Sequence, residues 1–258
     1  MRIVGLQTDI AWEDRRANFS RIDAMLDASP GLGEGSLLVF PELSTSGFTM
    51  NTSAVAEPRG GESETYFSGL ARRLRSHVIA GIAARTEHPV LAANESVCFG
   101  PDGGTLARYR KRNPFPLIDE AKHYPAGNEV VVFEIHGWKV APLICYDLRF
   151  PEPFREATAL GAELFVVIAN WPVVRVDHWI TLLRARAIEN LAYVVGINRS
   201  GRDPHLSYPG ASLIVAPRGE ILAQAGEEPS VIQADLDLEA LRQWRRDFPA
   251  LSCLNPTP

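Results

Sequence analysis

Short apolar runs alternate along the chain with segments in which apolar residues recur at helical spacing. The runs are rich in Val, Ile, Leu and Ala, which is typical of buried β-strands. We predict strands at residues 2–7, 36–42, 78–84, 129–135, 138–145, 162–170, 192–198, 211–217 and 230–236. Residues 14–28 and 176–191 predict amphipathic helices that pack on a sheet. The alternation favours one α/β domain over residues 1–258, for which a doubly wound sheet is the generic architecture.

Several of the predicted strands end in a polar residue. Glu42, Cys145, Asn170 and Asn198 each close an apolar run. Because ligand crevices of α/β sheets lie at strand ends along one edge, we expect these side chains to converge on one site. Residues 112–129 are the longest stretch without periodicity, which predicts an active-site loop.

The composition narrows the classes of partner. The chain has 258 residues, of which 46% are hydrophobic and 22% charged, and its net charge is −5. This charge argues against nucleic-acid or anionic-membrane binding. No apolar stretch approaches the ~18 residues of a membrane span, and the N-terminus lacks the apolar core of a secretion signal. We therefore expect a cytoplasmic protein, whose three widely spaced cysteines are reduced.

Common catalytic signatures are missing from the sequence. It contains no GxSxG, HExxH, CxxC or GxxxxGK[ST] motif and no dinucleotide-binding GxGxxG. The six histidines do not form a cluster with metal-ligand spacing. We therefore expect neither a metal nor a cofactor.

Cys145 has two interpretations. A thiol in an apolar strand is usually a core residue, but the sequence "YDLRFPEPFREA" that follows predicts a sharp turn into a helix opened by Pro151 or Pro153. Such a turn would leave the thiol accessible from one side. The charged residues after it are then expected to brace the turn.

Three blocks of sequence resemble the nitrilase, or carbon–nitrogen hydrolase, superfamily. They are "LLVFPEL" with Glu42, "ARYRKRNPF" with Lys111 and "LICYDLRFPEPFR" with Cys145, and further similar segments extend over nearly the whole chain. The resemblance implies a Glu-Lys-Cys catalytic triad at these three residues and an additional active-site glutamate at Glu120. It also implies a four-layer αββα sandwich and a homodimer. As a solvated surface acid, Glu120 would have no such role.

These residue types suit attack on an amide. A free cysteine has a pKa of about 8.5, so little thiolate is present at neutral pH and a base is needed. Glu42 can take the thiol proton, while Lys111 and the backbone N–H of Tyr146 can stabilise the oxyanion. Ammonia would leave, and Glu42 would activate water to hydrolyse the thioester on Cys145. We expect a thiol reagent to modify Cys145 before the other cysteines.

Among the branches of the superfamily, the chain is most similar to the ω-amidases. The segments "STSGF", "FPLIDEAKHYPAG" and "NWP" carry this likeness. It implies hydrolysis of the terminal amide of a small carboxylate such as 2-oxoglutaramate or 2-oxosuccinamate. The alternatives are a branch that acts on nitriles or ureido compounds, and a catalytically silent binding protein with the same fold.

Residues that contact the substrate are harder to identify from the sequence. The candidates near strand ends are Phe48, Phe115, Tyr146, Asn170 and Trp171. An arginine is the natural ligand for a substrate carboxylate, because its planar fork binds both oxygens. The candidates are Arg149, Arg155, Arg184 and Arg186, although a structural ion pair is the competing explanation for each.

Overall fold

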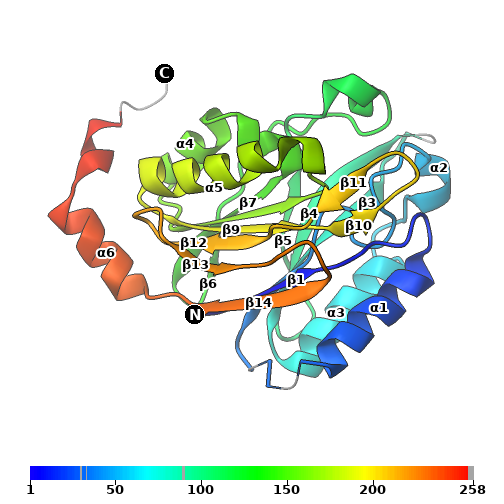
Figure 1. Ribbon diagram of the computed structural model, residues 1–258, viewed down its shortest axis with the longest axis horizontal. Helices are drawn as coiled ribbons and strands as arrows, with labels where there is room; N and C mark the ends of the chain where they lie inside the picture. The colour runs from blue at the N-terminus through cyan, green and yellow to red at the C-terminus, as the bar shows by residue number, and fades with distance from the viewer. Residues whose placement is uncertain (30, 33, 89–90, 255–258) are drawn as a thin grey trace.

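The computed structural model describes residues 1–29, 31–32, 34–88 and 91–254. Two mixed β-sheets, each with six strands in this part of the chain, face one another between outer helices (Figure 1). The first has the order β14 (Ser230–Asp235), β1 (Arg2–Gln7), β2 (Leu37–Val39), β3 (His77–Arg85), β4 (Ala92–Phe99) and β5 (Thr105–Arg110). The second has the order β13 (Ile221–Gln224), β12 (Leu213–Val215), β9 (Tyr193–Asn198), β8 (Leu164–Ala169), β7 (Trp138–Ile144) and β6 (Phe133–Ile135).

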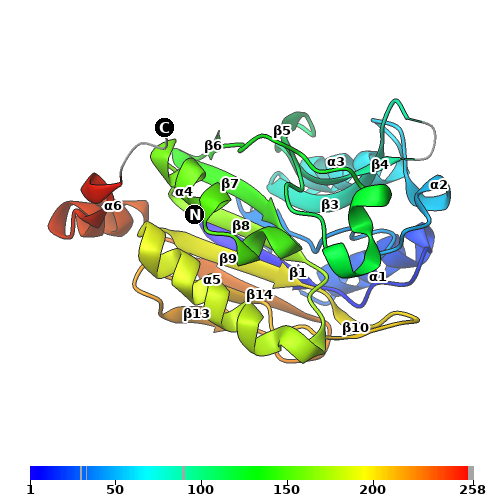
Figure 2. The same cartoon turned by 90° about the horizontal axis from the view of Figure 1, so that it is seen from above.

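The helices form the two outer layers. Helices α1 (Arg15–Asp27) and α3 (Glu62–Leu74) cover the first sheet, and α4 (Glu152–Ala159) and α5 (Val176–Asn190) cover the second (Figures 1 and 2). Helix α6 (Leu238–Asp247) extends away from the sandwich (Figure 2). The smaller elements are α2 (Thr52–Val55), the hairpin strands β10 (Ser200–Arg202) and β11 (Ser207–Pro209), and the 3₁₀ helices η1 (Pro116–Ile118), η2 (Glu120–Lys122), η3 (Cys145–Arg149), η4 (Val173–Arg175) and η5 (Ala250–Cys253).

Alternation along the strands explains the layers. In β1, Ile3 packs between the sheets, whereas its neighbour Val4 packs outward with Ile22 of α1 and Phe67 of α3. Strand β8 is buried along its whole length because the other sheet covers one face and helices cover the other. The four-layer sandwich is therefore confirmed, and the doubly wound alternative is wrong.

Some of the predicted helices and strands agree with the structure and others do not. The helices at 14–28 and 176–191 correspond to α1 and α5, but the strand predicted at 129–135 is confined to Phe133–Ile135. Strands β4 and β5 and helices α3 and α6 were not predicted, because polar and charged residues interrupt their apolar pattern. None of the described helices has the length and apolar character needed to cross a membrane.

Candidate active site

Cys145 lies at the turn that follows β7. The strand ends at Ile144, and Cys145 opens η3 with a backbone φ of +47°, a left-handed conformation that is costly for a residue with a side chain. The neighbouring parallel strands β8 and β9 end at the same edge, where Asn170 and Asn198 lie. The predicted strand-end turn at Cys145 is thus confirmed, and the residue is buried, with 8% of its surface exposed.

Asp147 fastens this turn to the first sheet. Its Oδ2 accepts hydrogen bonds from the Ile144 N–H (3.0 Å) and from the Tyr109 hydroxyl of β5 (2.7 Å). Its Oδ1 accepts bonds from the Asn113 N–H and Nδ2, both 2.9 Å. Burial raises the pKa of Asp147, while these donors oppose the shift. Asp147 therefore holds the strained turn against the end of β5, and Lys111 is the residue that follows this strand.

Glu42 reaches the same place from β2. Beyond Val39 the chain continues beside β3, with the Ser44 N–H bonded to the Gly81 carbonyl (2.9 Å). A Cβ at Gly81 would lie 2.5 Å from Glu42 Cα, so only glycine allows this close approach of the two backbones. The Glu42 side chain is completely buried.

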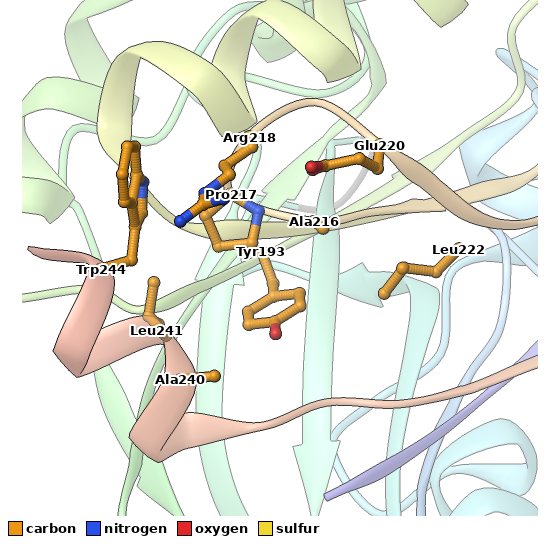
Figure 3. A pocket seen from close by; sticks show the side chains of 9 residues that line it. All are labelled: Tyr193, Ala216, Pro217, Arg218, Glu220, Leu222, Ala240, Leu241 and Trp244. Atoms are coloured by element: carbon orange, nitrogen blue, oxygen red, sulfur yellow. The ribbon is translucent and has the colours of Figure 1, made fainter.

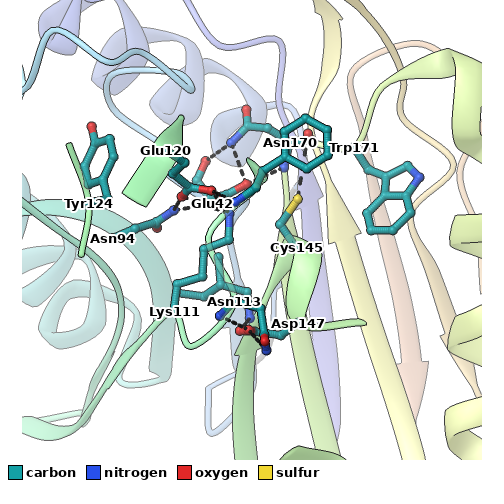
Figure 4. A network of polar contacts seen from close by, with 12 residues as sticks. Glu42, Asn94, Lys111, Asn113, Glu120, Tyr124, Cys145, Asp147, Asn170 and Trp171 are labelled. Atoms are coloured by element: carbon teal, nitrogen blue, oxygen red, sulfur yellow. Dashed lines mark hydrogen bonds and ion pairs between the residues drawn. The ribbon is translucent and has the colours of Figure 1, made fainter. Parts of the chain in front are cut away.

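Lys111 lies between two carboxylates. Its Nζ is 2.9 Å from Glu42 Oε1 and is 3.0 and 2.9 Å from the two oxygens of Glu120 (Figure 4). Glu120 also accepts a bond from the Phe115 N–H at 2.6 Å. All three charged side chains are buried, so the interpretation of Glu120 as a surface acid is wrong. The segment 112–129 thus delivers Glu120 to the buried cluster.

Two asparagines complete the polar network around Glu42. Asn94 Nδ2 donates to Glu42 Oε1 (2.7 Å) and to Glu120 Oε1 (3.1 Å). The Asn170 N–H donates to Glu42 Oε2 at 2.9 Å, and its Nδ2 donates to the Glu42 carbonyl at 2.8 Å. Cys145 Sγ lies 3.9 Å from the Asn170 carbonyl oxygen (Figure 4). Asn170 therefore contacts both the carboxylate and the thiol.

The ionisation states follow from burial and from these neighbours. Burial would raise the pKa of Glu42, but the charge and hydrogen bonds of Lys111 and Asn94 outweigh it, so its pKa lies below the ordinary value. For Glu120 burial prevails and its pKa is raised. Burial would lower the pKa of Lys111, yet the two carboxylates hold it well above its usual range. Burial, followed by the charge of Glu42, raises the pKa of the Cys145 thiol well above normal.

A narrow pocket of about 40 Å³ opens beside Cys145. All five predicted substrate-contact residues line it, together with two arginines. The lining residues are Phe48, Phe115, Ile118, Cys145, Tyr146, Arg149, Asn170, Trp171, Pro172, Arg175 and Leu206. The walls are thus largely aromatic and apolar, which is typical of a small-molecule site with few polar groups.

The other candidate arginines have structural contacts. Arg155 and Arg186 both pair with Glu189, and Arg184 donates to the Gly219 carbonyl. These three do not line the pocket beside Cys145, whereas Arg149 does. For these three arginines the structure therefore favours the structural explanation, and Arg149 is the candidate that lies at the pocket.

Several residues of the site were not predicted from the sequence. Asn94 lies in the interior of β4, Asp147 two positions after Cys145, and Arg175 in η4. The available signal for Asn94 is a group of polar residues inside an otherwise apolar run, Asn94, Glu95 and Ser96 in "AANESV". In the sequence, Asp147 and Arg175 look like ordinary turn residues. Their contacts, with Tyr109 and with the Phe115 ring respectively, come from distant segments of the chain.

A larger pocket of about 370 Å³ lies elsewhere, between α6 and the β12–β13 turn (Figure 3). Tyr193, Arg218, Glu220 and Trp244 are the lining residues with polar side-chain atoms, and the described residues that line it include neither a cysteine nor a lysine. Among the described residues, no three His, Cys, Asp or Glu side chains are arranged to hold a metal ion. The arrangement at Cys145 is therefore where a nucleophile, a carboxylate and a cation meet.

Comparisons with known proteins agree with this geometry. A sequence model described as carbon–nitrogen hydrolase matches residues 2–246. The chain is 38% identical to omega-amidase YafV of Escherichia coli K12, over 97% of this chain and 95% of that protein. It is 35% identical to the 2-oxoglutaramate amidase of Bacillus subtilis, over 95% and 93%.

Among solved structures, the chain is similar to a CN-hydrolase superfamily protein of Xanthomonas campestris with an arsenic adduct in its active site. The TM-score is 0.93 with 33% identity, and the match covers 100% of this chain and 98% of that one. The chain therefore belongs to the carbon–nitrogen hydrolase family, whose members hydrolyse carbon–nitrogen bonds other than peptide bonds.

Proposed function

We propose that the protein is an amidase that hydrolyses the terminal amide of a small 2-oxo acid, 2-oxoglutaramate or 2-oxosuccinamate, to the acid and ammonia. The observation that carries this proposal is a pocket lined by Cys145 and two arginines, in which Asn170 contacts both the thiol and Glu42, the partner of Lys111. The similarity to an omega-amidase and to a 2-oxoglutaramate amidase supports the substrate class.

In the first half of the reaction, Cys145 Sγ attacks the amide carbon as Glu42 takes the thiol proton. The base is needed because the pKa of the thiol is raised, while Glu42 is kept ionised by Lys111. The anionic oxygen that forms is stabilised by Lys111 Nζ and the Tyr146 backbone N–H. Collapse breaks the carbon–nitrogen bond, the proton held by Glu42 passes to the nitrogen, and ammonia leaves.

In the second half, Glu42 takes a proton from water, which attacks the thioester carbon and releases the acid and the thiol. Glu120 keeps Lys111 in place throughout, through contacts of 3.0 and 2.9 Å. Asn170 Oδ1 is buried and has no hydrogen-bond partner among the described residues, so it is available to the substrate N–H₂ group. Phe48, Phe115, Tyr146 and Trp171 form the walls around the carbon chain.

The direct test measures ammonia released from 2-oxoglutaramate and 2-oxosuccinamate by the wild type and by Cys145→Ala and Glu42→Gln. We expect Cys145→Ala to lose all measurable turnover and Glu42→Gln to lose about 10²- to 10⁴-fold in kcat. Exposed Cys253→Ala is the matched control and should keep wild-type rates.

The outcome separates the alternatives. If the wild type releases no ammonia from either compound but hydrolyses a nitrile or a ureido compound, another branch is correct. No hydrolysis of any of these substrates would favour a silent binding protein. Unchanged turnover in Glu42→Gln would contradict its role as the base.

We also propose that residues 1–258 act as one domain and that two copies associate. One hydrophobic core that includes residues of both sheets supports the single domain. Exposed Leu160 and Ile188, next to α4 and on α5, support association through the outer helices. Cytoplasmic location and the absence of a nucleic-acid partner, metal and cofactor stay predictions.

A further inference from the structure

The pocket beside Cys145 has an unbalanced charge. Of its lining residues within the described part of the chain, Arg149 and Arg175 are cationic and none is acidic. Glu42 and Glu120 do not line this pocket; both are buried and form ion pairs with Lys111. Cys145 occupies the buried part of the pocket, whereas both arginines are half-buried. The outer part therefore attracts an anion.

The two arginines differ in how they are held. Arg149 Nη2 donates to His178 Nδ1 at 2.9 Å, and its guanidinium lies 5.1 Å from the centre of the Trp171 ring. The Arg175 guanidinium lies 5.2 Å from the centre of the Phe115 ring, and in the described residues its side chain has neither a hydrogen bond nor an ion pair. Arg175 thus keeps its whole donor fork available.

One short segment connects Arg175 to the reacting groups. The Asn170 N–H donates to Glu42. The next residue, Trp171, is held by Asn198, which accepts a hydrogen bond from the Trp171 N–H (2.7 Å) and donates one to the Trp171 carbonyl (3.0 Å). The Trp171 indole N–H then donates to the Arg175 carbonyl at 2.7 Å. The position of Arg175 relative to Glu42 is therefore set by hydrogen bonds along residues 170–175.

We propose that Arg175 binds the carboxylate end of the substrate beside Arg149 and thereby selects amides that carry a carboxylate. This rests on the proposed amidase function and names the residue that gives it specificity. Phe115 holds the guanidinium from one side, so less side-chain freedom is lost when the fork binds both carboxylate oxygens. A neutral amide gains nothing from this contact.

The test compares Arg175→Gln on 2-oxoglutaramate and on pentanamide, a neutral amide of the same chain length. Loss of a charge-assisted bond predicts a KM for 2-oxoglutaramate raised about 10- to 100-fold, with kcat changed far less. The kcat/KM for pentanamide should fall much less. Arg175→Lys, which keeps the charge without the fork, should be intermediate. Arg184→Gln, outside the pocket, is the control and should match the wild type.

A second measurement does not depend on turnover. The product 2-oxoglutarate is titrated calorimetrically into Cys145→Ala and into Cys145→Ala with Arg175→Gln, and the second protein should bind about 10-fold more weakly or worse. Equal binding, an unchanged KM, or equal losses on both amides would overturn the role of Arg175. A wild type that leaves 2-oxoglutaramate intact would instead remove the proposed function itself.

Discussion

The pocket beside α6 is the larger of the two pockets compared, but the pocket beside Cys145 has the reactive groups. The α6 pocket, of about 370 Å³, is roughly nine times larger than the 40 Å³ beside Cys145. Yet the smaller one adjoins three buried charges joined by hydrogen bonds, whereas Arg218 and Glu220 at the larger one form no such network with the described residues. Size is therefore a poor guide to the site in this molecule.

The difference has a physical origin. Helix α6 packs mainly through Leu241 and extends from the sandwich, so the space beneath it is loosely filled. Near Cys145, buried charges need partners at fixed distances, because each would otherwise lose its hydration without compensation. Because each buried charge is in contact with its partners, little empty space is left between these side chains. A catalytic centre built on buried ions is thus expected to be small until its substrate enters.

The largest effect should come from removing the cation. Lys111→Met leaves Glu42 and Glu120 buried without their partner, so we expect the free energy of unfolding to fall by about 3–5 kcal/mol. Lys122→Met is the matched control, because Lys122 pairs with Asp119 where both side chains are largely exposed, and it should change stability very little. Urea denaturation at neutral pH measures both.

The same variant has a pH signature. In the wild type, Lys111 lowers the pKa of Glu42, so its stabilising effect is present above the ordinary glutamate pKa and is lost as the pH falls through the lowered value. In Lys111→Met, protonation removes the unpaired charges, so the deficit should shrink towards pH 4 to 5. Equal deficits for the Lys111 and Lys122 variants would contradict the buried cluster.

Much of the site could be predicted because the chemistry falls at strand ends. Cys145 and Asn170 close apolar runs that are visible in the sequence, and the resemblance to a family identified Glu42 and Lys111. The two sheets follow from alternation in strands such as β1, but alternation alone did not distinguish the sandwich from a doubly wound sheet. That choice depends on which strands pair across long stretches of chain.

The residues that were not predicted act through distant partners. Asn94 meets Glu42 across 52 positions of sequence, and Asp147 meets Tyr109 across 38. Neither contact leaves a local pattern, since an asparagine in a strand and an aspartate in a turn are ordinary. Arg175 could not be separated from the other arginines until the structure showed which of them have partners.

A smaller effect concerns the order in which thiol reagents modify the cysteines, which was expected from the sequence to begin at Cys145. Cys145 is buried with a raised pKa, whereas Cys253 is exposed, so the expected first reaction at Cys145 now depends on the reagent. We expect a bulky aromatic disulfide to modify Cys253 roughly tenfold faster than Cys145 and to leave activity intact. Iodoacetamide, which is small and carries an amide, should enter the pocket and inactivate.

Peptide mass mapping against residual activity measures this order, with Cys253→Ala as the control. The product 2-oxoglutarate should slow inactivation by iodoacetamide, because it fills the pocket. Rapid inactivation of Cys253→Ala by the bulky disulfide would show that the thiol is more open than the structure indicates.

The smallest effect should come from the larger pocket. The Trp244 ring lies 4.0 Å from the Arg218 guanidinium and stacks on Phe248, contacts that hold α6 without reaching Cys145. Trp244→Ala should therefore lower the free energy of unfolding by about 1 kcal/mol and change kcat/KM by less than about twofold. Urea denaturation and ammonia release from 2-oxoglutaramate measure the two quantities. A tenfold loss of kcat/KM at unchanged stability would mean that the α6 pocket is coupled to the reaction, and the contrast between the two pockets would fail.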